Sequence, residues 1–118
     1  MGLEVEIYEA GSYLLIKAAG QYSLVDLTEL LDRTVQEAEN RNYAEVLLDL
    51  SAVAGTVPIL DMLVLGEHCA RVWTRTRKLA IVSERGGLDR FFEDVSINRG
   101  VLLAVFPNQS AALAWLMT

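Results

Sequence analysis

The pattern of hydrophobic and polar residues predicts a β-hairpin at the start of the chain. Residues 3–8 alternate apolar and polar side chains, the period-two pattern of a half-exposed strand. A turn follows at Ala10-Gly11, and the apolar run 13–16 starts a second strand that Gly20 ends. Two strands joined by so short a turn favour a hairpin.

The hydrophobic period changes to that of a helix after the hairpin. Ser23 and Asp26 form a helix-capping pattern, and apolar residues then recur three and four positions apart from Leu24 to Ala38. The intervening positions are polar. We therefore expect an amphipathic helix that covers one side of a sheet and faces water on its other side.

The rest of the chain alternates short apolar runs with helical patterns. The runs lie at 46–50, 78–83 and 101–106, and the helical patterns at 59–74, 88–95 and 109–117. Continuous apolar runs are typical of parallel strands that are covered on both faces. The predicted fold is therefore a single α/β domain with the order β-β-α-β-α-β-α-β-α. Its sheet is a single mixed layer, mostly parallel, with an N-terminal hairpin.

The helical segment 59–73 is apolar around most of its circumference. Such a helix needs cover on two sides, and the sheet provides only one. We expect a partner subunit, a bound apolar ligand or a membrane surface to supply the other. The residues predicted to form this surface are Leu60, Leu63, Val64 and Trp73.

Composition and charge exclude several classes of protein. With 118 residues, 53% of them hydrophobic, the chain is not intrinsically disordered. Sixteen acidic residues against ten basic ones give a net charge of −6, which argues against nucleic acid as a partner. The imbalance lies in the first half, because residues 1–59 hold three basic and ten acidic side chains.

One short segment concentrates positive charge. Arg71, Arg75, Arg77 and Lys78 lie close together with no acidic residue between them. One interpretation is a solvated helix end, where the helix dipole favours cations. The alternative is a patch that binds an anionic surface such as a membrane.

The chain shows no signal for export or for a membrane span. The N-terminal residues are acidic and alternating, and no apolar run approaches the length of a spanning helix. The single cysteine, Cys69, cannot form an internal disulfide, and no metal-type Cys/His spacing is present. We expect a cytoplasmic protein without a metal or cofactor.

No set of residues points to catalysis. The one histidine, His68, lies between Glu67 and Cys69, and consecutive helical side chains point about 100° apart. These three residues therefore do not converge on one ion or substrate atom. Because zinc-protease, redox and phosphate-loop motifs are also missing, we expect that the protein is not an enzyme.

The carboxyl ends of the predicted parallel strands are the better candidate binding site. Ligands of open α/β sheets bind in a crevice beyond these ends. The candidate crevice residues are Asp49, Ser51, Thr56, Ser83, Arg85, Gly86 and Gly87. Backbone N–H groups at Gly86-Gly87, with Arg85, would suit an anion. The alternatives are that the glycines only permit a turn and that Asp49 caps nearby backbone donors.

Several short stretches, in their order along nearly the whole chain, resemble the STAS domain and in particular its SpoIIAA-like branch. They are Leu14-Leu15-Ile16 with Gly20, Val46-Leu47-Leu48-Asp49-Leu50-Ser51, Leu65-Gly66-Glu67-His68, Lys78-Leu79-Ala80-Ile81-Val82, Phe91-Phe92-Glu93-Asp94, Asn98-Arg99-Gly100, and Val105-Phe106 followed by Ala114-Trp115-Leu116. The resemblance implies one STAS/SpoIIAA-like domain over residues 1–118.

The resemblance also implies a function. It is that of a small cytoplasmic, non-catalytic regulatory or binding module. Because a catalytic set is missing and the helix at 59–73 is apolar nearly all round, we expect this module to act through protein contacts as a homodimer. Antagonist proteins of the wider family are phosphorylated on a serine just beyond the third strand. This chain reads Gly55-Thr56-Val57-Pro58 there, so only Thr56 offers a hydroxyl, a departure that argues against phospho-regulation. The SpoIIAA-like branch also looks like a small version of the lipid-binding Sec14 fold. The alternative function is therefore a carrier or sensor of a small apolar or amphiphilic ligand at a membrane surface.

Overall fold

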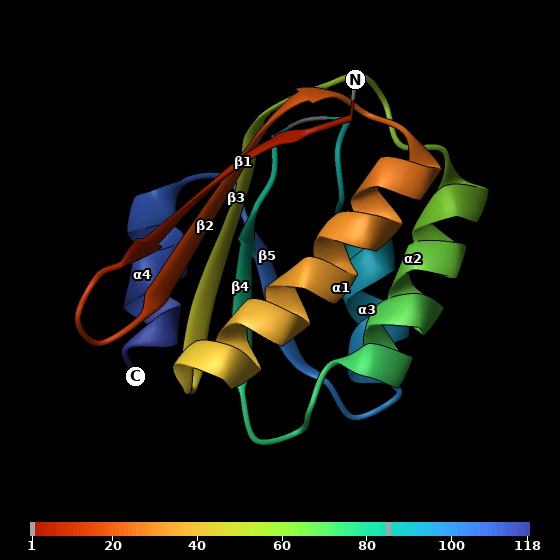
Figure 1. The fold of residues 1–118 in the computed structure, drawn as a ribbon. Helices are drawn as coiled ribbons and strands as arrows, with labels where there is room; N and C mark the ends of the chain where they lie inside the picture. The colour runs from red at the N-terminus through yellow and green to blue at the C-terminus, as the bar shows by residue number, and fades with distance from the viewer. Residues whose placement is uncertain (1, 85) are drawn as a thin grey trace.

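A computed structural model describes residues 2–84 and 86–118 as one five-stranded sheet with four helices (Figure 1). The elements, in chain order, are β1 (Glu4–Glu9), β2 (Leu14–Gln21), α1 (Leu24–Arg41), β3 (Glu45–Ala54), α2 (Ile59–Val72), β4 (Lys78–Val82), α3 (Arg90–Ile97), β5 (Leu102–Phe106) and α4 (Gln109–Leu116). This order confirms the predicted fold class and the N-terminal hairpin.

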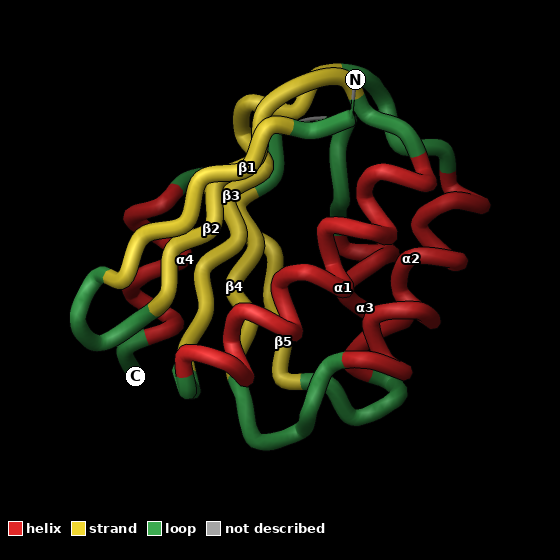
Figure 2. Tube along the Cα trace, in the orientation of Figure 1, coloured by secondary structure: helices red, strands yellow, loops and turns green. Residues whose placement is uncertain are grey.

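The strands lie side by side in the same order as in the sequence, β1-β2-β3-β4-β5. β1 pairs antiparallel with β2, and all other neighbours are parallel. Each parallel strand is added on the same side of the one before it, so right-handed crossovers place their helices on a single face. α1, α2 and α3 lie on this face, and α4 lies on the opposite face (Figures 1 and 2).

Two hydrophobic cores result from this arrangement. The larger one lies between the sheet and α1–α3, and its fully buried side chains include Leu14, Ile16 and Phe92. The smaller one lies under α4 and is formed by Leu47, Ala80, Val82, Ala112 and Leu116. β3 and β4 contribute to both cores, which explains why their sequences are continuously apolar.

The predicted capping of α1 is confirmed. The Ser23 hydroxyl accepts a hydrogen bond from the backbone N–H of Asp26 at 3.1 Å. At the other end, Asn42 adopts a left-handed conformation (φ 58°) and its N–H reaches the last carbonyls of the helix. The helix therefore begins and ends at local signals as well as packing on the sheet.

The observed bounds of β3 and α3 differ from the predicted ones for specific structural reasons, and other elements differ by a few residues at an end. β3 continues to Ala54, four residues beyond the apolar run, because its last residues pair with β2 after a register shift at Lys17/Ala19. α3 begins at Arg90 instead of residue 88, because the Asp89 side chain caps it by accepting from the N–H of Phe91. Hydrophobicity alone signals neither of these polar, backbone-mediated features.

Candidate functional site

The N-terminal half of α2 carries a row of exposed apolar side chains. Leu60 is 71% exposed and Val64, one turn later, is 46% exposed. Ile59 beside them is 64% exposed, and Leu63 is half-buried. We call Ile59, Leu60 and Val64 the α2 face. Leu60 and Val64 are the predicted surface residues that the sheet, α1 and α3 leave uncovered, and the structure adds Ile59 to them.

Trp73 does not belong to this surface, and its prediction as an interface residue is corrected. Its side chain is 5% exposed and packs in the larger core. Its indole N–H donates to the carbonyl of Arg77 at 2.8 Å. The helix ends at Val72, so the chain turns inward at this position and takes the aromatic ring with it.

Polar contacts hold both flanks of α2. The Tyr22 hydroxyl donates to the Asp61 carboxylate at 2.8 Å; burial, and then this hydrogen bond, raise the pKa of Tyr22. The ring Nε2 of His68 lies 2.7 Å from the Asp32 carboxylate on α1. On the far flank, Glu67 pairs with Arg99 beyond α3 at 3.0 Å. α2 is therefore anchored between its neighbours.

The side chains of Glu67, His68 and Cys69, consecutive residues of α2, point in different directions, as the helical geometry predicts. Glu67 and His68 bond to opposite flanks, and Cys69 is buried beneath them. Burial raises the pKa of the Cys69 thiol to about 12. In residues 2–84 and 86–118, no group of three His, Cys, Asp or Glu side chains is arranged to hold a metal ion.

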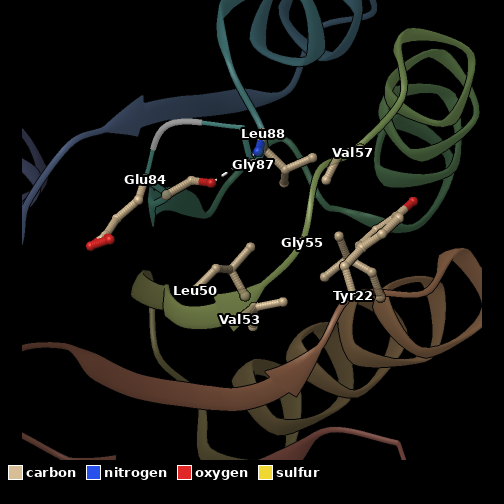
Figure 3. A pocket seen from close by; sticks show the side chains of 10 residues that line it. Tyr22, Leu50, Val53, Gly55, Val57, Glu84, Gly87 and Leu88 are labelled. Carbon is tan, nitrogen blue, oxygen red and sulfur yellow. Dashed lines mark hydrogen bonds between the residues drawn. The ribbon is translucent and has the colours of Figure 1, made fainter.

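Two open surface depressions of about 410 and 320 Å³ lie at the carboxyl ends of the strands, whereas the enclosed part of the predicted crevice is a small cavity (Figure 3). Its volume is about 30 Å³, room for one or two water molecules. Ten residues line it, most of them apolar: Tyr22, Leu27, Leu50, Val53, Gly55, Val57, Ser83, Glu84, Gly87 and Leu88. Of the predicted crevice residues, the structure brings Ser83 and Gly87 to this cavity, whereas Arg85 lies outside the described residues.

The small size of this cavity follows from the strand order. Crevices in open α/β sheets form where the strand order reverses and successive helices pass to opposite faces. Here the order from β1 to β5 contains no reversal. The strand ends are closed by Val57 and Leu88, which are 5% and 3% exposed.

The backbone N–H groups of the turn at Gly86-Gly87 bond to acceptors within the same turn. Gly87 donates to the carbonyl of Glu84 at 2.9 Å, and Leu88 donates to the Ser83 hydroxyl at 2.9 Å. Gly86 has a φ of +88°, which a side chain rarely adopts. These contacts agree with the alternative in which the glycines permit a turn. Gly86 also borders an open depression lined by three acidic side chains, Glu84, Asp89 and Glu93, and one basic side chain, Arg90. This net negative lining disfavours an anion.

Asp49 faces α4 instead of a ligand. Its carboxylate accepts hydrogen bonds from the N–H of Ser51 at 2.9 Å and from the side-chain amide of Gln109 at 2.6 Å. Burial alone raises the pKa of Asp49, but these hydrogen bonds and the charge of Lys17 outweigh it, so the pKa is lowered. The predicted capping role is confirmed, and Gln109 is the partner that sequence reasoning missed. Ser51 and Thr56 are exposed.

The four basic residues between the last turn of α2 and the start of β4 do not form one patch. The Lys78 ammonium group lies 4.7 Å from the centre of the Trp115 ring and donates to the Trp115 carbonyl. The Arg77 side chain donates to the carbonyl of Tyr43 at 2.9 Å. Only Arg71 and Arg75 are exposed. None of the helices in the described ranges is both long and apolar enough to span a membrane.

Comparison with solved structures identifies the fold. An anti-sigma factor antagonist from Mycobacterium paratuberculosis superimposes with a TM-score of 0.67 at 13% identity, over 99% of this chain and 96% of that one. An uncharacterised protein of the DUF3478 family from Shewanella loihica, with a SpoIIAA-like fold, gives 0.50 at 21% identity, over 98% and 93%.

Sequence comparisons add nothing to this result. No protein-family model and no curated protein matches the chain. The structural likeness extends over almost the full length of both neighbours, in agreement with the resemblance carried by the short sequence stretches. The chain therefore has the SpoIIAA-like fold of STAS domains.

Proposed function

We propose that the protein is a non-catalytic regulatory module that acts through protein contacts, and that the α2 face is its contact surface. The observation that carries this proposal is the exposure of Leu60, 71%, next to Val64 on an otherwise anchored helix. Burial of a leucine side chain stabilises a complex by up to about 1.5–3 kcal/mol. One structural neighbour, an anti-sigma factor antagonist, is by its name a protein that acts on another protein.

The partner that fits the α2 face is a second copy of the chain. Two-fold symmetric contacts place the same surface patch of both copies together. An axis passing between Leu60 and Val64 would pack Leu60 of each copy on Val64 of the other. Glu67 and Arg71 would then lie at the rim, where charged side chains stay hydrated.

Light scattering coupled to size-exclusion chromatography tests this proposal. At tens of micromolar, we expect the mass of two chains for the wild type and of one chain for Leu60→Asp, because a buried unpaired carboxylate opposes association. Met117→Asp is the matched control, since Met117 is an exposed apolar residue near the C-terminus, outside the α2 face. A wild-type mass of one chain contradicts the dimer.

The enclosed cavity at the strand ends does not support the alternative function, carriage of an apolar ligand. Ligand pockets for drug-sized molecules have volumes of about 300–1,000 Å³. The apolar cavity at the strand ends has about 30 Å³. Ligand carriage, membrane association and a cytoplasmic location therefore stay predictions.

A further inference from the structure

The two edges of the sheet are protected differently. At the β5 edge, the N–H of Val105 donates to the Glu93 carboxylate of α3 at 2.8 Å. This contact occupies a backbone group that would otherwise be free to pair with another strand. At the β1 edge, no comparable bond to an outward backbone group is present within the described residues. β1 is therefore the more open edge.

The hairpin turn determines which backbone groups of β1 point outward. Ala10 and Tyr13 form a hydrogen-bonded pair, because the N–H of Ala10 donates to the carbonyl of Tyr13 at 3.0 Å. Bonded and non-bonded pairs alternate along an antiparallel ladder. Glu4, Glu6 and Tyr8 therefore bond to β2, and the N–H and C=O groups of Val5 and Ile7 point away from the sheet.

A groove runs along this edge, between β1 and α1. Its volume is about 460 Å³, and the apolar side chains of Leu3, Val5 and Leu30 line it. β1 and α1 are joined beyond the groove by the ion pair between Glu9 and Arg41, at 2.7 Å. Leu3, Val5 and Ile7 are only partly buried against the larger core. An added strand would cover them.

The charges around the groove are mostly negative. Asp26 and Glu29 of α1 line it. Arg33 also lines it, and its guanidinium lies 3.9 Å from the Glu37 carboxylate. Glu4 and Glu6 extend from the opposite face of β1, where Lys17 of β2 is the cross-strand partner of Glu6 and offsets part of their charge. The groove and the strand beside it therefore favour a cationic occupant.

We propose that the outer edge of β1 binds an extended basic segment of another protein, which adds to the sheet as a sixth strand. The backbone of the segment would bond to Val5 and Ile7, and alternate side chains would enter the groove, as in other cases of strand addition. Apolar side chains of the segment would cover Leu3 and Val5 in the groove, and the alternating basic side chains would lie on the other face beside Glu4 and Glu6. Asp26 and Glu29 add to the negative potential at this edge. A second copy of β1 fits less well, because it would bring the glutamates of two strands into one ladder.

The test uses a labelled synthetic peptide of about eight alternating lysine and valine residues. Fluorescence anisotropy measures its binding, and amide NMR spectra locate it. We expect saturable binding that weakens as salt is raised, with the largest shifts at the amides of Val5 and Ile7. A peptide of alternating glutamate and valine is expected not to bind. Absence of binding at about 1 mM lysine peptide, or largest shifts on α2, overturns the proposal.

Peptide variants separate strand addition from charge attraction. N-methylation of the amides on one edge of the lysine peptide leaves its charge unchanged and removes the donors that the edge presents. Methylation of the peptide edge that faces β1 should weaken binding at least about tenfold, because it removes the donors to β1. Methylation of the other edge should weaken binding much less, because that edge bonds only to solvent. Equal effects of the two methylation patterns contradict strand addition.

Protein variants give an independent answer. Val5→Pro removes an outward N–H that β2 does not use, which an edge strand tolerates. We expect about tenfold weaker peptide binding, with a melting temperature lowered by no more than about 5 °C because Val5 is only partly buried. Glu29→Lys should weaken binding, whereas Glu39→Lys, an exposed position outside the groove, is the control. If Val5→Pro instead converts a dimer to a monomer, the edge belongs to a second copy and the proposal is wrong. Leu60→Asp should leave peptide binding unchanged, so this test is separate from that of the α2 face.

Discussion

Gly66 of α2 and Val95 of α3 are in contact so close that no side chain fits at position 66. A Cβ atom on Gly66 would lie 2.7 Å from Cγ1 and 2.9 Å from Cβ of Val95. Valine has a single strongly preferred rotamer in a helix, so its methyl group does not simply swing away. This contact sets the distance between the two helices.

Gly66→Ala is therefore expected to destabilise the protein. Alanine favours helix by about 1 kcal/mol over glycine, but overpacking typically costs about 1–3 kcal/mol, so we expect a net loss of up to about 2 kcal/mol. Urea unfolding measures the change. The double variant Gly66→Ala/Val95→Ala should be less destabilised than the sum of the two single variants, because the clash is absent. Strict additivity contradicts this explanation.

Lys78 is expected to hold α4 on the sheet. Its ammonium group contacts the Trp115 ring and the carbonyls of Trp115 and Leu116 at the C-terminus of α4. Lys78→Met keeps the aliphatic stem and removes the charge, and should lower the free energy of unfolding by about 1–2 kcal/mol. Arg75→Met, at an exposed position, should change it by less than about 0.5 kcal/mol. Similar losses for both variants would contradict the role of Lys78.

Asp49 makes stability depend on pH. Its pKa is lower in the folded protein than its ordinary value, so it contributes stability above that value and loses it as pH falls through the folded pKa. Asp49→Asn should lower the free energy of unfolding by about 1–3 kcal/mol near pH 7.

The measurement for Asp49 is urea unfolding over a pH series. The difference between wild type and Asp49→Asn should shrink as pH falls from about 5 toward 3, because the wild-type carboxyl then becomes protonated. Glu39→Gln, which changes an exposed carboxylate, should stay close to the wild type at every pH. A difference that does not vary with pH contradicts the assignment.

Cys69 is expected to be unreactive in the folded protein. The thiol is buried, and burial raises its pKa to about 12, so the reactive thiolate is scarce at ordinary pH. A thiol-specific disulfide reagent should label the native protein only as fast as local unfolding exposes Cys69. It should label the guanidinium-unfolded protein rapidly. Cys69→Ser supplies the blank. Rapid stoichiometric labelling of the native protein would show that the side chain is accessible.

Hydrophobic periodicity predicted the elements because each helix and strand buries one face or both. The continuous apolar runs of β3 and β4 correctly indicated cover on both faces. The same reasoning was wrong for Trp73, because a chain turn after α2 points its side chain inward. Periodicity describes where a side chain points on a regular element and does not extend beyond the element's end.

The candidate crevice shows the corresponding limit for sites. The sequence indicated a capping role for Asp49 and a turn at Gly86-Gly87 as alternatives to ligand binding, and the structure shows both. Their partners, such as Gln109, are distant in sequence. The open edge of β1 carried no sequence signal either, because it depends on which backbone groups the neighbouring elements leave unpaired.

The sequence by itself determined the element types, their order and the SpoIIAA-like character of the chain, because these follow from local hydrophobic period, capping residues and short stretches along one chain. Only the tertiary structure decided the strand order, the closure of the strand ends, the exposure of the α2 face and the difference between the two sheet edges. These properties arise where residues far apart in the chain meet or fail to meet. They depend on the packing of whole elements, which no local pattern encodes.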